Sequence, residues 1–203
     1  MQKLYLFSQK NRLEAGCDEA GRGCLAGPVV AAAVILDQNN VILGLNDSKK
    51  LNETQRLVLK DEIIKKALAF GIGVAEVSEI DELNILNASI LAMHKAISQL
   101  KISPDFLLID GNRFQPYLSI PHETIVKGDA KFQSIAAASI LAKTHRDYLM
   151  NCLHQKNPDY DWKTNKGYPT LKHRKALQNF GVSIHHRKTF RLFAVNSQLN
   201  LFN

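Results

Sequence analysis

A predicted hairpin near the amino terminus constrains the fold more than any other feature of the sequence. Residues 13–20 and 28–36 are interpreted as two strands, and the second opens with a proline, which the first position of a strand tolerates. Gly21, Gly23 and Gly27 lie between them, and glycines between two strands are typical of a turn. The chain is therefore expected to begin with two antiparallel strands.

The rest of the chain alternates helical patterns with strand patterns. Helical patterns cover residues 52–69, 84–100, 132–149 and 171–180, and strand patterns cover residues 70–77, 106–110 and 124–127. A hairpin followed by such alternation predicts an α/β fold with a mixed sheet, antiparallel at first and parallel later. The 203 residues show no internal repeat and no Gly-, Ser- or Pro-rich linker, so we expect one domain.

Positive charge is concentrated in the last third of the chain. Residues 143–191 contain eleven Lys/Arg and three Asp/Glu, a net charge of +8, while the rest of the chain carries −1. A charge run is usually an ordinary solvated surface, but one this localised is expected of a surface that binds a polyanion such as nucleic acid.

Several protein classes are excluded by what the sequence lacks. No apolar run approaches the roughly 20 residues that cross a bilayer, and the first residues do not form a signal-peptide pattern, so we expect a cytoplasmic protein.

The three cysteines form no Cys-x-x-Cys pair, which argues against disulfides and a zinc knuckle. His173, His185 and His186 are not spaced for zinc either, and structural or phosphate-facing roles are expected. The glycine-rich turn misses the dinucleotide-binding spacing and precedes a strand, and no P-loop occurs.

Four carboxylates follow predicted strands. They are Asp18, Glu19, Asp110 and Asp129. Strand ends in α/β sheets collect ligands, and a cluster of acids there repels itself unless cations neutralise it. Each acid alone is equally an ordinary turn residue. Together they favour a site for hard divalent cations, which bind carboxylates and substrate phosphates.

Seven segments, in a fixed order, carry the most specific information. The first is residues 17–23 with 25–29, and the others are residues 47–51, 109–112, 127–129, 134–143 with 146–147, 167–170 with 173, and 186–190. Together they resemble the motifs of the ribonuclease HII family. Two departures, Pro169 where glycine is frequent and Thr189 where serine is common, leave the chemistry unaffected.

The resemblance implies a ribonuclease H-like fold, with a mixed five-stranded sheet flanked by helices and a small helical C-terminal part. It also implies catalysis by two divalent ions, Mg²⁺ or Mn²⁺. By position, the family's four metal-binding acids match Asp18, Glu19, Asp110 and Asp129. The implied divisions are a single domain over residues 1–203, with a catalytic core at about 10–150, a basic helical part at about 151–195 and a tail at 196–203.

The resemblance also implies the substrate contacts. Gly21, Arg22 and Gly23 match the segment that contacts the 2′-hydroxyl of a ribonucleotide, and Tyr168 matches a tyrosine that stacks on the sugar next to the scissile junction. Our candidates for phosphate contacts are Lys49, Lys143 and Arg187.

The implied activity is hydrolysis of the RNA strand of RNA/DNA hybrids and incision 5′ of single ribonucleotides in duplex DNA, leaving 3′-hydroxyl and 5′-phosphate ends. Two alternatives stay open. A non-catalytic nucleic-acid-binding module would satisfy the basic region but needs no acids. A nuclease of the ribonuclease HI class would use the same metals and require several consecutive ribonucleotides, but it lacks the Asp-Glu pair before Gly-Arg-Gly.

The last residues of the chain resemble a second, shorter motif. Gln198, Leu199, Leu201 and Phe202 are similar to the segment with which bacterial replication and repair proteins bind the DNA sliding clamp. The alternative is that the two apolar side chains at the end fold back on the protein's own surface. We expect no association with a membrane, and the protein is expected to be a monomer.

Overall fold

A mixed five-stranded sheet forms the centre of the protein in a computed structural model, which describes residues 4–9 and 12–193. The strands are β1 (Glu14–Ala20), β2 (Val29–Ile35), β3 (Ala69–Ala75), β4 (Phe106–Asp110) and β5 (His122–Ile125). Their order in the sheet is β3-β2-β1-β4-β5. The pairs β1–β2 and β2–β3 are antiparallel, and the pairs β1–β4 and β4–β5 are parallel. The fold prediction is confirmed, including the change from antiparallel to parallel pairing.

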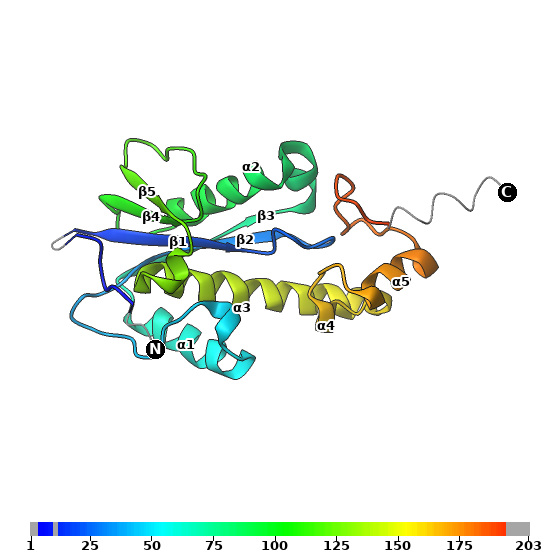
Figure 1. The fold of residues 1–203 in the computed structure, drawn as a ribbon, viewed down its shortest axis with the longest axis horizontal. Coiled ribbons are helices and arrows are strands. Elements are labelled where there is room, and N and C mark those ends of the chain that lie inside the picture. Colours follow the sequence, from blue (N-terminus) through cyan, green and yellow to red (C-terminus); the bar gives the residue numbers. More distant parts are fainter. Residues whose placement is uncertain (1–3, 10–11, 194–203) are drawn as a thin grey trace.

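Helices cover both faces of the sheet (Figure 1). They are α1 (Glu53–Lys66), α2 (Val77–Ser98), α3 (Gln133–Lys156), α4 (Trp162–Asn165) and α5 (Leu171–Phe180). One face packs against α2 and the other against α3, which α1 supports from outside. None of the helices in the described ranges has the length and hydropathy needed to span a bilayer.

The strand β2 is buried on both faces, and its small side chains let helices approach from both sides. Ala31 and Ala33 belong to the core beneath α2, while Ala32 and Val34 belong to the core beneath α1 and α3. Successive side chains of a strand point to opposite faces of the sheet, so alternate residues of β2 pack against different helices.

Close packing of α3 on β1 brings the helix to the strand that carries two of the predicted acids. A Cβ atom at Gly16 would lie 2.2 Å from the backbone carbonyl carbon of Ser134, so glycine is required at this contact. The 24 residues of α3 extend about 36 Å, from the sheet to the C-terminal part.

The C-terminal part has a core of its own, which packs against the far half of α3. Tyr160, Trp162 and Leu177 cluster with Met150 of α3 and with Leu25 of the glycine-rich turn. The division expected at residue 151 falls inside α3, so the two parts share one helix.

The boundaries of several elements differ from the expected ones. The helix expected from Asn84 starts earlier, at Val77, and Asn84 interrupts it with a left-handed backbone (φ 66°). The Asn84 side chain accepts the N–H groups of Leu86 and Asn87, and so caps the second segment, which is the part that the pattern predicted. The pattern also placed the end of α3 seven residues early, placed β5 two residues late, and missed α4.

Candidate active site

The four predicted acids meet at one edge of the sheet. Asp18 and Glu19 lie near the end of β1, and Asp110 ends β4, the parallel neighbour of β1. Parallel strands end at the same edge, so these carboxylates are brought side by side. Asp129 lies in a short 3-10 turn after β5, and the Gly128 N–H in that turn donates to Asp110 Oδ1 at 2.7 Å. That bond holds the turn against the end of β4.

The acids raise one another's pKa values. Asp18 is 5% exposed, and burial, followed by the charges of Glu19 and Asp110, raises its pKa well above the ordinary value. Burial also raises the pKa of Glu19, against the effect of Arg22, whose guanidinium lies 3.1 Å from the Glu19 carboxylate. Burial and the charge of Asp110 raise the pKa of Asp129 to about 6. A cation among these groups would relieve the repulsion.

The chemistry of these donors fits a hard divalent cation, because carboxylate oxygens are ligands that Mg²⁺ and Mn²⁺ prefer. Within residues 4–9 and 12–193, no three or more His, Cys, Asp or Glu side chains are grouped so that they could hold a metal ion by themselves. Mg²⁺ is usually bound by one or two carboxylates together with substrate phosphates, so an open arrangement is the one expected for metal shared with a substrate.

Lys49 stands beside the acids. Burial works against its charge, but the charges of Asp47, Asp129 and Asp18 outweigh burial and raise the pKa of Lys49. The Asp47 side chain accepts the Lys49 N–H at 2.9 Å and caps the 3-10 helix Ser48–Lys50. The loop thereby holds one positive charge at the rim of the acid cluster.

Ser48 and Ser139 also belong to the site, although the sequence argument singled out neither. Their hydroxyl groups lie 2.8 Å apart, and the Ser139 side chain opposes the rise in the pKa of Asp18. The two serines are 91 residues apart in the sequence. The available signal was their membership of two of the ordered motifs, residues 47–51 and 134–143.

A pocket of about 250 Å³ joins the acids to the glycine-rich turn. Its lining residues are Asp18, Glu19, Ala20, Gly21, Arg22, Gly23, Ser48, Lys49, Ser139, Lys143 and Tyr168. The pocket therefore gathers two of the acids and all the predicted substrate-binding residues except Arg187. Asp110 lines a smaller hollow next to it, together with Glu19 and Arg22.

Tyr168 lies at the rim of the pocket on a rigid segment. Its N–H donates to the Asn165 carbonyl, and its carbonyl accepts from His173 Nδ1, both at 2.9 Å. Gly167 has a φ of +83°, and a Cβ there would lie 2.5 Å from the Ala26 carbonyl oxygen. The Tyr168 segment is therefore packed directly on the glycine-rich turn.

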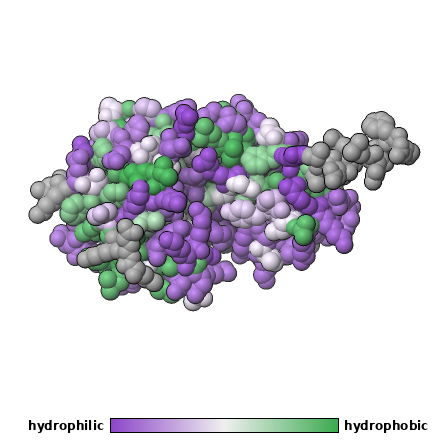
Figure 2. All heavy atoms as spheres, in the orientation of Figure 1, coloured by the Kyte–Doolittle hydropathy of each residue, from purple (hydrophilic) through white to green (hydrophobic). Residues whose placement is uncertain are grey.

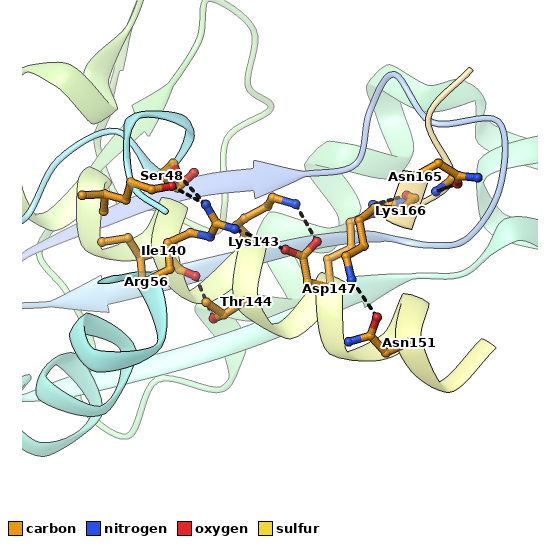
Figure 3. A network of polar contacts seen from close by, with 12 residues as sticks. Ser48, Arg56, Ile140, Lys143, Thr144, Asp147, Asn151, Asn165 and Lys166 are labelled. Atoms are coloured by element: carbon orange, nitrogen blue, oxygen red, sulfur yellow. Dashed lines mark hydrogen bonds and ion pairs between the residues drawn. The ribbon is translucent and has the colours of Figure 1, made fainter. Parts of the chain in front are cut away.

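Lys143 of α3 lines the pocket, and its ammonium group forms an ion pair within the protein. Its ammonium group pairs with Asp147, which also lies 3.8 Å from Arg56 of α1. Arg56 in turn donates to the carbonyls of Ser48 and Leu51 at 3.2 and 2.6 Å. Figure 3 shows this network along α3, and it ties α1, α3 and the loop that carries Lys49 into one support for the pocket.

The prediction that Arg187 contacts phosphate is contradicted by its position. Its side chain is 0% exposed, and its guanidinium donates to the carbonyls of Arg22, Gly27 and Pro28 at 2.8–3.2 Å. A side chain enclosed in this way does not reach a phosphate. The prediction failed because net charge along the sequence does not distinguish a buried arginine from an exposed one.

Comparison with known proteins decides the family. A family model described as Ribonuclease HII matches residues 15–193. The chain belongs to the ribonuclease HII family. Its relatives include ribonuclease HII of Phocaeicola vulgatus, 58% identical over 200 residues that cover 98% of each chain. Another is ribonuclease HII of Porphyromonas gingivalis, 59% identical over 178 residues, which are 88% of this chain and 89% of the relative.

Solved structures of this family share the fold. Ribonuclease H2 of Pyrococcus horikoshii is 27% identical with a TM-score of 0.73, covering 88% of this chain and 94% of that one. The ribonuclease HII in a complex with PCNA from Archaeoglobus fulgidus is 26% identical with a TM-score of 0.75, covering 91% and 99%.

Membership of the ribonuclease HII family makes this chain a divalent-metal-dependent endoribonuclease with ribonuclease H activity. The reading as a non-catalytic nucleic-acid-binding module is thereby excluded, and so is the ribonuclease HI class.

Proposed function

We propose that this ribonuclease HII cuts the RNA strand of RNA/DNA hybrids and also incises duplex DNA 5′ of a single ribonucleotide, leaving a 3′-hydroxyl and a 5′-phosphate. The observation that carries the proposal is the shared pocket of Asp18, Glu19, the turn at residues 21–23 and Tyr168. One ribonucleotide differs from DNA in its sugar by the 2′-hydroxyl, so an enzyme that selects it must place recognition groups beside the reacting ones.

The glycine-rich turn is suited to reading a sugar. Gly21 adopts a φ of +100°, which favours glycine, and the space around a Cβ at Gly23 is open. Backbone without a Cβ approaches a sugar closely enough for its N–H and C=O groups to bond a hydroxyl. Tyr168, 41% exposed, offers an aromatic face in the same pocket for stacking on the neighbouring sugar. None of these contacts depends on the base sequence.

The four acids hold the metal in this proposal. Asp18, Glu19 and Asp110 would hold one divalent ion, Mg²⁺ or Mn²⁺, and Asp129 would help to hold a second. When bound, the ions would supply activation of the attacking water and charge stabilisation for the leaving oxygen. Burial and the repulsion between the acids raise the pKa of Asp18 and of Asp129, and this supports the assignment.

Positive groups around the pocket provide affinity for the phosphates. Lys49 and Lys143 line the pocket itself. Residues 143–191, which include Lys143 as well as the buried Arg146 and Arg187, carry a net charge of +8, and this part of the molecule presents a largely hydrophilic surface (Figure 2). Phosphate contacts of this kind position a duplex without reading its sequence.

The test uses a labelled duplex with one ribonucleotide, incubated with Mg²⁺, with Mn²⁺ or with EDTA. The expected result is a single cut 5′ of the ribonucleotide with either metal and none with EDTA, and a DNA polymerase should extend the new 3′ end. The same duplex made only of DNA is the control and should stay intact. Cutting that requires several consecutive ribonucleotides would overturn the single-ribonucleotide part of the proposal.

We also propose that the C-terminal tail binds the DNA sliding clamp. Gln198, Leu199, Leu201 and Phe202 lie outside the described residues. Support comes from the motif in the sequence and from the relative in A. fulgidus, which was solved in a complex with PCNA. Burial of an apolar side chain contributes roughly 1.5–3 kcal/mol, from which the cost of ordering the tail is subtracted, so affinity in the micromolar range is expected.

The clamp proposal is tested with a labelled peptide of the last ten residues, titrated into a purified bacterial clamp. A matched peptide with Leu201→Ala and Phe202→Ala is the control. Saturable binding of the first peptide alone is expected. Equal behaviour of the two peptides would contradict the assignment.

A further inference from the structure

Two arginines lie beneath the glycine-rich turn without an acidic partner. Arg146 of α3 is 1% exposed and Arg187 is 0% exposed. Among the ion pairs of the described residues, none includes either guanidinium. Burial lowers the pKa of Arg187 to about 10, so it stays protonated at neutral pH. Buried charges are normally paired with opposite ones, and two unpaired cations at one place need another explanation.

Arg187 is bonded to three carbonyl groups of the turn. Its Nε and Nη2 atoms donate to the Gly27 carbonyl at 3.0 and 2.8 Å, and Nη2 also donates to the Pro28 carbonyl at 3.2 Å. Its Nη1 atom donates to the Arg22 carbonyl at 2.9 Å. One guanidinium therefore fixes both the start and the end of the segment that links β1 to β2.

Arg146 fixes the same segment from the side of α3. It donates to the carbonyls of Pro28, Ala26 and Lys166 at 3.0, 3.1 and 2.8 Å. Its side chain lies directly under Gly21, because a Cβ at that position would be 2.0 Å from Arg146 Nε. The bond to Lys166 also ties the turn to the segment that carries the tyrosine of the pocket.

These bonds determine which way the peptide groups of the turn point. In a trans peptide the C=O of one residue and the N–H of the next point in opposite directions. Since the Arg22 carbonyl faces Arg187, the Gly23 N–H faces away from it. Within the described residues this N–H has no hydrogen-bond partner in the protein, and Gly23 lines the pocket. The turn thus presents a free donor beside the catalytic acids.

We propose that Arg146 and Arg187 are positioning residues for substrate recognition, which hold the carbonyl groups of the turn inward so that the Gly23 N–H faces the ribonucleotide. This rests on the proposed reading of the 2′-hydroxyl by the turn, and neither arginine touches the substrate. Each guanidinium bonds carbonyl groups in several directions at once from a rigid planar group. A lysine keeps the charge but lacks that planar set of donors, so the two residue types are not equivalent here.

The test compares Arg187→Lys with a matched control, Arg174→Lys. Arg174 of α5 also donates to backbone carbonyls, those of Arg191 and Leu192, but lies outside the turn. Two quantities are measured for each protein. One is kcat/KM on a duplex with a single ribonucleotide, and the other is the inhibition constant of the same duplex made only of DNA, which reports the phosphate contacts alone.

A misplacement of about 1 Å can cost roughly 100-fold in rate, so kcat/KM of Arg187→Lys should fall by about that factor. The inhibition constant of the DNA duplex should stay unchanged, and Arg174→Lys should resemble the wild type in both. Cooperative thermal unfolding verifies that each variant folds, and Arg146→Lys replaces Arg187→Lys if the latter does not.

Three results would overturn the inference alone: a folded variant with wild-type kcat/KM, an equal loss of affinity for the DNA duplex, or failure of both arginine variants to fold, which would assign them to stability. A wild-type protein that leaves the single-ribonucleotide duplex uncut would overturn the proposed function, and the inference with it.

Discussion

Acidification should destabilise the protein through His186, which is fully buried. Its Nδ1 atom accepts from the N–H and the hydroxyl of Ser183 at 3.0 and 2.9 Å. His173 Nδ1 donates to the Tyr168 carbonyl, so His173 Nε2 is an acceptor, and it accepts from Trp162 Nε1 and from His186 Nε2, both at 3.1 Å. Both rings are fully bonded in the neutral form. A proton added to His186 Nδ1 would face the Ser183 N–H, which can only donate.

The size of the effect follows from the pKa of His186. Burial, and then the neighbouring His173, lower that pKa to about 4, whereas an unfolded histidine titrates near 6.5. Between these values the unfolded chain binds a proton that the folded chain does not, so the free energy of unfolding falls as the pH falls. Each pKa unit corresponds to about 1.4 kcal/mol, which makes the total loss about 3 kcal/mol below pH 4.

Urea unfolding of the wild type and of His186→Gln, at pH 7.5 and pH 4.5 in EDTA, measures this loss. The glutamine does not titrate, so the difference between the two proteins removes the contribution of the carboxylates. The stability advantage of the wild type should shrink by roughly 2–3 kcal/mol on acidification. A difference that stays constant between the two pH values would refute the reasoning. His173 and His186 would then not form a network that requires neutral rings.

Three further outcomes are expected. Asp110→Asn should abolish cleavage at saturating Mg²⁺. Its melting temperature in EDTA should stay equal or rise, because the substitution removes one of the charges that raise the pKa of Asp18. Near-normal turnover would contradict the metal assignment. Tyr168→Ala should reduce kcat/KM more for a single ribonucleotide than for a continuous hybrid, and equal losses would leave Tyr168 a packing residue. Gly21→Ala should lower the free energy of unfolding in urea by roughly 1–3 kcal/mol, since its φ of +100° and the Arg146 side chain leave no room for a methyl group; wild-type stability would contradict that geometry.

Much of the fold could be predicted from the sequence because it depends on local pattern. The apolar stretch at residues 28–36 predicted a strand, and the structure places β2 there, buried on both faces. The start of α2 was predicted wrongly. The helical pattern begins at Asn84, but the chain is already helical from Val77. The helix α4 was not predicted, because its four residues make only about one turn and are too few to show a helical period of apolar side chains.

The acids of the site could be located for the same reason. Asp18, Glu19 and Asp110 stand at the ends of apolar strands, and the parallel pairing that joins those ends follows from the alternation of helices with strands. Ser139 could not be identified in this way. It is one of several small residues on α3, and its contact with Asp18 exists only because α3 packs on β1 at Gly16.

The order of the elements, the family motifs and the carboxylates at the strand ends could be predicted from the amino-acid sequence, because they depend on residues close together in the chain. Which distant segments meet and which charges are buried became known only from the folded protein. Arg187 and Lys143 both lie in the basic last third, but Lys143 lines the pocket while Arg187 is enclosed by the carbonyls of Arg22, Gly27 and Pro28. Burial depends on how the whole chain packs, so two positive residues from the same part of the sequence have different positions: Lys143 lines the pocket, and Arg187 supports the glycine-rich turn from beneath.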